Sequence, residues 1–216
     1  MADYEILSMI LSNFILMFVY LHSMKEKVLN IPNVLSFYRL AAFPLILWFI
    51  VRDKELLFFI FLVISFVTDI ADGIIARRFG LETKFGAKLD SLADDLTYLL
   101  AIAGIFTFKY QEIYPYILSF SVFIGFLFLT IIVSLIKFRR VPSFHLYTTK
   151  AGGYIQGAFV IALFTIGFIP AYYYFMIFWG ILASAEHIAI QLIIPEMRSN
   201  VKGLYWVLKE REKREL

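Results

Sequence analysis

The chain has 216 residues, of which 61% are hydrophobic and 19% aromatic. This usage lies far above that of a soluble domain and indicates an integral membrane protein with one compact helical domain. Cysteine is absent, which excludes a disulfide scaffold, a thiolate metal site and a cysteine nucleophile. The formal net charge is +3. The basic residues lie in short loops between apolar runs and form no patch as large as a nucleic-acid duplex, so nucleic acid is excluded as a partner.

Seven apolar runs each approach the roughly twenty residues that a helix needs to cross a bilayer. They lie near residues 5–22, 33–51, 56–76, 88–108, 113–136, 151–169 and 172–194. The sequence therefore predicts an all-α integral membrane protein. Its six-transmembrane-helix core bundle is joined by an additional N-terminal hydrophobic helix and a C-terminal cytoplasmic amphipathic helix. The expected boundaries are 1–23 for the extra helix, 24–200 for the membrane domain and 201–216 for the charged surface helix.

The first apolar run has neither a basic flank nor a small-residue cleavage site, so it is unlike a signal peptide. We expect it to span the membrane or to insert deeply, with an interfacial helix as the alternative. If all seven runs span, one side of the membrane receives only Arg52, Lys54 and Lys109 as basic residues. The positive-inside rule then makes the other side cytoplasmic and predicts an inner (cytoplasmic) membrane protein.

The second run begins with polar residues among apolar ones. Asn33, Ser36 and Arg39 repeat at i, i+3 and i+6, which places them on one face of a helix. Two interpretations follow from this face. Either the three side chains line a ligand pocket, or Asn33 caps the helix while Arg39 extends its charged end to the membrane surface.

The next two runs carry aspartates that include Asp69, Asp72, Asp90 and Asp94, although an unpaired charge inside a bilayer costs about 2.5 kcal/mol or more. Asp69 and Asp72 are spaced i, i+3, and Asp90 and Asp94 are spaced i, i+4, so each pair lies on one face of its helix. If the two pairs face each other, they form an all-oxygen cage of the kind that Mg2+ or Mn2+ prefers. Two such ions can hold both the attacking and the leaving oxygen of a phosphoryl transfer. The alternative interpretation pairs the acids with the nearby basic residues Arg77, Arg78, Lys84 and Lys88.

The full pattern from Asp69 to Asp94 reads D-x2-D-G-x2-A-R-x8-G-x3-D-x3-D. It resembles the signature of the CDP-alcohol phosphatidyltransferases at every specified position and in both gap lengths. The resemblance implies an enzyme of phospholipid biosynthesis that transfers the phosphatidyl group of CDP-diacylglycerol to an alcohol and releases CMP. It further implies Mg2+ or Mn2+ as cofactor, with two ions bound, and a homodimer among membrane lipids. The predicted topology opens the four acids to the cytoplasm.

The same resemblance assigns roles to individual residues. Asp69, Asp72, Asp90 and Asp94 are implied as metal ligands, and Asp90 and Asp94 also as catalytic residues, with Asp94 as the general base. The residues implied to bind the CDP group are Asn33, Ser36, Arg39, Gly73, Ala76, Arg77 and Gly86. The small residues would leave room for the nucleotide, and Arg77 would supply a fixed charge for its phosphates.

The stretch from Lys150 to Gln156 is similar to the G-K-x-K-T-x2-Q segment of phosphatidylglycerophosphate synthases in its first lysine and its glutamine. It departs from that segment at Gly152 and Gly153, and Asp95 stands where those enzymes commonly have lysine. Glycerol 3-phosphate is the favoured acceptor, because phosphate recognition needs fixed positive charge. The residues expected to hold it are Arg139, Arg140, Lys150 and Gln156. Serine, inositol or inositol phosphate and a lipid acceptor stay open, as does a purely topological role for the basic residues.

Two functions outside this class also use buried acids. A cation transporter would not require Gly73, Ala76 and Arg77 between the acids of the motif. The inverted repeat that is typical of many transporters is also not evident in the sequence. An aspartate-rich membrane prenyltransferase also uses DxxD motifs on magnesium, but such enzymes carry the two motifs far apart in sequence. Glu186 and His187 lie inside the last run, where a hydrogen bond between helices is favoured over catalysis.

Overall fold

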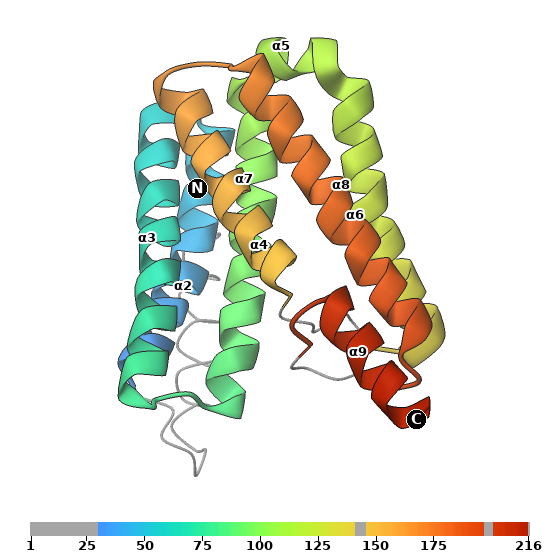
Figure 1. Ribbon diagram of the computed structural model, residues 1–216. Coiled ribbons are helices and arrows are strands. Elements are labelled where there is room, and N and C mark those ends of the chain that lie inside the picture. The colour runs from blue at the N-terminus through green and yellow to red at the C-terminus, as the bar shows by residue number, and fades with distance from the viewer. Residues whose placement is uncertain (1–29, 141–145, 197–200, 216) are drawn as a thin grey trace. The chain divides into compact units, whose positions relative to one another are not determined.

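The structure is a computed structural model that describes residues 30–140, 146–196 and 201–215. These residues are mostly helical and form no strand, which confirms the predicted all-α class. The elements are α2 (Ile31–Val51), α3 (Glu55–Phe79), α4 (Lys84–Phe108), α5 (Tyr110–Ile113), the 3-10 helix η1 (Tyr114–Tyr116), α6 (Ile117–Phe138), α7 (Tyr147–Thr165), α8 (Pro170–Ile193) and α9 (Leu204–Glu215), labelled in Figure 1. The predicted N-terminal hydrophobic helix, residues 1–23, lies outside the described residues. The chain divides into two compact units, Met1–Tyr110 and Gln111–Leu216.

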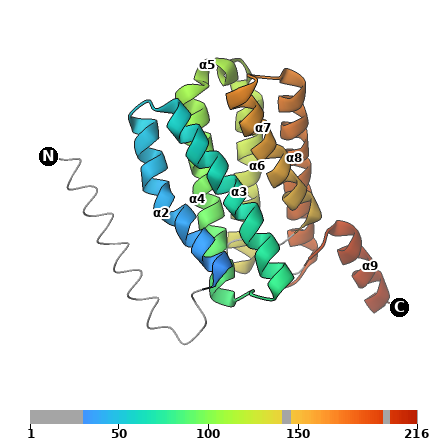
Figure 2. The same ribbon diagram turned by 90° about the vertical axis from the view of Figure 1, so that its left-hand side faces the viewer.

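The first unit contains α2, α3 and α4, and α2 packs against both of the others (Figure 2). Local signals set the helix ends. The Asn30 side chain accepts a hydrogen bond from the Asn33 N–H at 2.9 Å and so caps α2. The Thr83 hydroxyl caps α4 in the same way through the Gly86 N–H, and Gly80 ends α3 at a left-handed φ of 63°. The interpretation that Asn33 caps the first core helix is therefore wrong, because Asn30 holds that position.

Apolar side chains hold the three helices together. Phe58 and Leu62 of α3 are fully buried. The Phe58 ring lies so close to Gly104 of α4 that an added Cβ there would overlap it, so this glycine permits the close approach of the two helices. Many large apolar side chains are exposed on the outer faces, including Leu56 and Leu99. Extensive exposed apolar surface of this kind is typical of a protein surrounded by lipid.

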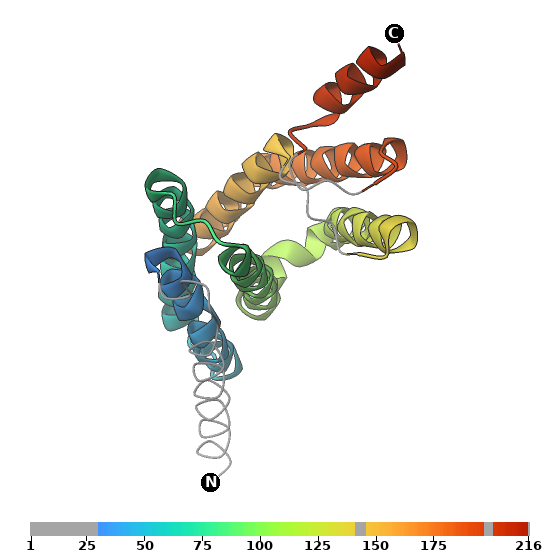
Figure 3. The same cartoon turned by 90° about the horizontal axis from the view of Figure 1, so that it is seen from below.

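The second unit is organised around α8, which contacts α6, α7 and α9 (Figure 3). Gly180 of α8 lies against the Phe123 ring of α6, where an added Cβ would overlap the ring. Polar groups also pair between these two helices, since the Gln191 side-chain amide donates to the Thr130 carbonyl at 3.2 Å. This hydrogen bond offsets part of the cost of burying the Gln191 amide.

Glu186 of α8 joins the starts of two further helices. One carboxylate oxygen accepts a hydrogen bond from the Leu204 N–H at 2.8 Å, at the first residue of α9. The other oxygen accepts a hydrogen bond from the Thr148 hydroxyl of α7. The hydrogen bond between helices expected at this position is therefore present. Leu204 and Val207 of α9 also pack on a buried cluster formed by Leu146, Ile190, Ile194 and Val201.

Among the described residues, five helical segments are long and apolar enough to cross a membrane. They are Ile31–Val51, Glu55–Phe79, Phe85–Phe108, Tyr110–Phe138 and Pro170–Ile193. This indicates an integral membrane protein. The segment predicted as a span at 151–169 forms α7, which is not one of the five. Its first turns carry Thr148, Thr149 and Lys150 followed by glycines, which lowers its hydropathy, so the six-span core stays a prediction.

Candidate active site

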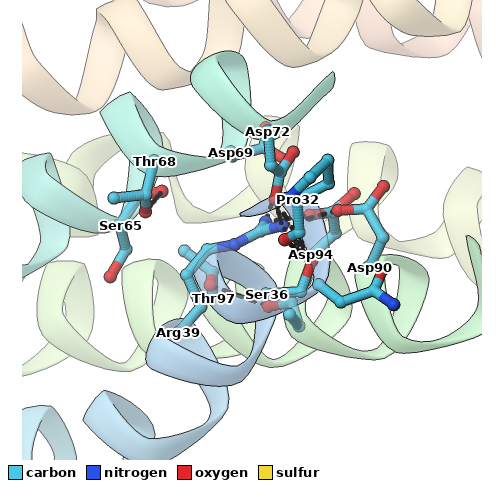
Figure 4. A network of polar contacts seen from close by, with 12 residues as sticks. Pro32, Ser36, Arg39, Ser65, Thr68, Asp69, Asp72, Asp90, Asp94 and Thr97 are labelled. Atoms are coloured by element: carbon cyan, nitrogen blue, oxygen red, sulfur yellow. Dashed lines mark hydrogen bonds and ion pairs between the residues drawn. The ribbon is translucent and has the colours of Figure 1, made fainter. Parts of the chain in front are cut away.

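Four aspartates converge in the first unit, two from α3 and two from α4 (Figure 4). Their spacing within each helix places each pair on one face, and the packing of the helices in this unit brings the two faces together around Arg39 of α2. One ligand atom from each of Asp69, Asp72 and Asp90 lies within 4.8 Å of the other two. Three carboxylates so close together suit a metal ion that prefers oxygen ligands.

Arg39 contacts all four acids. Its Nη1 donates to Asp69 at 2.8 Å and also to Asp94, while its Nη2 donates to Asp72 at 2.6 Å and to Asp90 at 2.5 Å. Sequence reasoning placed Arg39 on the correct face but missed this pairing. The ion pairs that the structure shows for the four acids are therefore made with Arg39 of α2.

Burial differs sharply within the cluster. The side chains of Arg39 and Asp72 are 1% and 4% exposed, whereas those of Asp69, Asp90 and Asp94 are 41%, 40% and 46% exposed. The guanidinium thus lies on the buried side of the cluster, whereas three of the four carboxylates are partly exposed to solvent. The charged end of Arg39 is buried among the acids and does not reach solvent, so the second interpretation of its role is wrong.

The other residues of the predicted face on α2 are buried with Arg39. Asn33 and Ser36 are each 2% exposed. The Ser36 hydroxyl lies 3.2 Å from an oxygen of Asp72 and 3.3 Å from the Pro32 carbonyl, so it donates to one of these acceptors. The helix face predicted from the i, i+3, i+6 spacing therefore points toward the acids, and its role in binding a nucleotide stays a prediction.

The small residues of the motif have different neighbours. A Cβ added to Gly86 would overlap the Asn33 side chain, so this glycine makes room for α2. A Cβ added to Gly73 would lie 3.3 Å from a guanidinium nitrogen of Arg77, which therefore lies over Gly73. Ala76 is half-buried and Arg77 is exposed.

The residues predicted to hold the acceptor lie in the second unit. Arg139 and Arg140 follow the end of α6 and are exposed, and Arg139 has a left-handed φ of 54°. On α7, Lys150 is exposed and Gln156 is half-buried. Their role as acceptor ligands stays a prediction.

Gly152 is one of the two departures from the phosphatidylglycerophosphate synthase pattern. It is buried, and a Cβ there would lie 3.4 Å from the Trp179 ring. The Trp179 N–H in turn donates to the Thr148 carbonyl at 3.0 Å, which fixes the ring against α7. An added Cβ would therefore make a van der Waals contact with the indole, so the Trp179 ring packs directly against this glycine.

Comparison with known proteins gives several matches. A CDP-diacylglycerol–glycerol-3-phosphate 3-phosphatidyltransferase of Aquifex aeolicus (strain VF5) is 28% identical over 188 residues, which cover 84% of this chain and 100% of that protein. A CMP-forming cardiolipin synthase of Streptomyces coelicolor is 38% identical over 96 residues, or 42% of this chain and 43% of that protein. A chloroplastic CDP-diacylglycerol–glycerol-3-phosphate 3-phosphatidyltransferase of rice is 43% identical over 70 residues, or 32% of this chain and 21% of that protein.

The chain thus spans less than half the length of the rice and Streptomyces relatives, although it spans the whole Aquifex protein. No solved structure matches it. The model of the CDP-alcohol phosphatidyltransferase family matches residues 29–190, a region that includes α2, α3 and α4 and the four acids. The chain belongs to the CDP-alcohol phosphatidyltransferase family.

Proposed function

We propose that this protein transfers the phosphatidyl group of CDP-diacylglycerol to a small alcohol, with release of CMP, in phospholipid biosynthesis. The observation that carries the proposal is the meeting of four aspartates from both halves of the family motif in one partly exposed cluster. Family membership and the names of the relatives support the same reaction class and speak against a transporter or a prenyltransferase.

The carboxylates fit a divalent cation of the Mg2+ or Mn2+ type. Asp69, Asp72 and Asp90 bring ligand atoms within 4.8 Å of one another, and carboxylate oxygens are the donors that these hard ions prefer. Asp94 completes the set of residues proposed to hold two ions. When bound, such ions neutralise the phosphate oxygens and stabilise the leaving phosphate.

The chain's own residues supply the remaining chemistry. We assign Asp94 as the general base: its carboxylate accepts the proton of the acceptor hydroxyl while the acceptor oxygen bonds to the lipid-side phosphorus. The bond from that phosphorus to the oxygen of CMP breaks, and CMP leaves with the bonding electron pair. The acceptor oxygen attacks the phosphorus directly, so no covalent enzyme intermediate is needed.

The nucleotide is proposed to bind beside the acids. Arg77 is exposed over Gly73, the residue that follows Asp72, where its charge can pair with a phosphate. Ala76 and the buried face of Asn33 and Ser36 complete the proposed CDP site. Gly86 leaves room for the Asn33 side chain, so we assign Gly86 to the shape of the site. Arg39 pairs with the acids, so we assign it to the charge of the site.

Glycerol 3-phosphate is the proposed acceptor. The name of the Aquifex relative, which this chain covers in full, supports it. The Streptomyces relative is named a cardiolipin synthase, so a lipid acceptor is the second candidate. The test offers glycerol 3-phosphate, serine, inositol, inositol phosphate and phosphatidylglycerol in turn to purified protein with CDP-diacylglycerol and Mg2+ or Mn2+. CMP and a new lipid with one acceptor support the proposal, and no CMP with any acceptor contradicts it.

We further propose that the protein is a homodimer of the inner membrane with its acids facing the cytoplasm. The asymmetric distribution of basic residues supports the orientation. Chemical labelling of single cysteines introduced near Arg78 and Lys54, at opposite ends of α3, tests the orientation in sealed vesicles, since the wild-type chain has no cysteine.

The acceptor assignment predicts a selective effect at Lys150. If Lys150, helped by Arg139 or Arg140, binds the acceptor phosphate, Lys150→Gln should raise the Michaelis constant for glycerol 3-phosphate by about tenfold or more, since a charge-assisted hydrogen bond contributes about 1.5 to 3 kcal/mol. The Michaelis constant for CDP-diacylglycerol should change little. Lys202→Gln, at another exposed lysine of the second unit, is the matched control. An equal effect on both substrates would remove the assignment.

A further inference from the structure

Arg39 bonds one oxygen of each of the four aspartates through its two terminal nitrogens. Its side chain is 1% exposed, and within the part of the chain that the structure describes its Nε is buried and makes no hydrogen bond. All of its charge-assisted bonds in the cluster are therefore made by Nη1 and Nη2. An arginine is protonated at every physiological pH, so this positive charge is a permanent part of the cluster.

The charges in the cluster do not balance. One guanidinium compensates one carboxylate, and four carboxylates contact it. Without Arg39, the cluster would hold closely spaced like charges with no internal partner, which is unfavourable where burial limits solvation. With Arg39, the acids can come together before any metal binds, yet the remaining negative charge still attracts a divalent cation.

The carboxylates that pair with the Arg39 guanidinium are also the proposed ligands of the metal ion. Asp69, Asp72 and Asp90, whose ligand atoms lie within 4.8 Å of one another, are three of the four acids that Arg39 holds. Two positive charges that share their ligands repel each other, and each weakens the attraction that the carboxylates offer to the other. Such coupling is reciprocal: a metal ion loosens the contacts of Arg39 to the same degree as Arg39 weakens the binding of the metal.

We propose that Arg39 is an internal counter-cation that stabilises the metal-free acid cluster and competes with divalent metal for its carboxylates. The inference rests on the metal site of the proposed function. Its consequence is that α2, which contributes none of the four acids, lowers the affinity of the cluster for metal. The opposing account makes Arg39 a positioning residue that holds the carboxylates ready for the metal. The two accounts predict opposite signs for the effect of its removal on metal binding.

The test measures Mn2+ binding to the purified full chain in detergent, by the paramagnetic resonance of free Mn2+, without any substrate. Arg39→Gln should bind Mn2+ about tenfold more tightly than the wild type, within the range typical of coupled sites. It should also unfold at a lower temperature than the wild type in the absence of metal, and the difference should narrow at saturating Mn2+. Arg52→Gln is the matched control, because Arg52 is an exposed arginine at the far end of the same helix.

Arg39→Lys covers the case in which the glutamine variant does not fold. Lysine keeps the positive charge but loses the forked donor geometry, so we expect a smaller gain, of about threefold, in Mn2+ affinity. Mn2+ binding that is unchanged or weaker in the folded Arg39 variant would overturn the competition and favour positioning. If the wild type itself binds no Mn2+, the metal site of the proposed function fails, and these two failures are therefore distinguishable.

Discussion

Asp69→Asn, Asp72→Asn and Asp90→Asn should each lower CMP release by at least about a hundredfold, comparable to the loss of one preorganised group that stabilises the transition state. Each change removes one negative charge from a group whose ligand atoms lie within 4.8 Å of one another. The amide that replaces the carboxylate has nearly the same shape, so the variants should stay folded in detergent. The measurement is CMP formation from CDP-diacylglycerol with Mg2+ or Mn2+, beside a thermal unfolding curve for each variant.

Asp95→Asn is the matched control for this series. Asp95 follows Asp94 on α4, is exposed, and makes none of the contacts to Arg39 that define the cluster. It should keep nearly full activity. Turnover like that of the wild type in any two of the three cluster variants would remove the metal assignment.

Asp94→Asn should lower the rate of transfer by about a hundredfold to ten-thousandfold while the protein still binds CDP-diacylglycerol in the presence of metal. Asp94 is assigned to proton removal, and its ligand atom is not one of the three that lie within 4.8 Å of one another. An asparagine cannot accept the proton of the acceptor hydroxyl. Loss of the Asp94 carboxylate should therefore slow the chemical step more than it weakens binding of CDP-diacylglycerol.

Two assays on Asp94→Asn separate these effects. Binding of CDP-diacylglycerol is measured with Mn2+ and without an acceptor, and transfer is measured in a single turnover after the acceptor is added. Asp90→Asn serves as the comparison, because a ligand variant should lose both. Equal losses of binding and transfer in Asp94→Asn would make Asp94 primarily a metal ligand.

Hydropathy placed the helices of the first unit well but missed their ends. The run at 56–76 becomes a helix that continues to Phe79, and the run at 88–108 begins at Lys84. These ends are set by Gly80 and by the Thr83 cap, which are backbone signals that a search for apolar runs does not detect.

In the second unit, Pro115 breaks the run predicted at 113–136. The segment begins with the short α5 and the 3-10 helix η1, and α6 starts only at Ile117. Proline cannot donate the backbone hydrogen bond of a helix interior, which explains the break. Pro170, in contrast, opens α8 at its first helical position, where that donor is not required.

The motif predicted which acids meet, because its two spacings each define one helix face. It did not predict the partner that compensates them. A buried arginine in an apolar helix requires an acidic partner, and in the first unit Arg39 pairs with four aspartates. The sequence alone did not place α2 against both α3 and α4, and without that packing Arg39 could not be paired with the acids.

The acceptor residues are the part of the site that sequence patterns specify least. Lys150 and Gln156 match the segment of the phosphatidylglycerophosphate synthases. Gly152 departs from it, and the Trp179 ring of the next helix lies against this glycine. The presence of glycine instead of lysine at position 152 is related to Trp179, which is distant in sequence. A local sequence pattern therefore does not show whether the acceptor site differs as well.

The measurement that tests the central claim most directly is metal-dependent CMP release by the wild-type protein. Chelator-treated protein is given CDP-diacylglycerol and glycerol 3-phosphate, and CMP and the phosphatidyl product are quantified before and after Mg2+ or Mn2+ is added. We predict no CMP before addition, and CMP and lipid product in equal amounts afterwards, with Zn2+ a poor substitute because it prefers ligands other than a cage of carboxylates. Equal CMP release with and without metal, or release of diphosphate in place of CMP, would contradict the account.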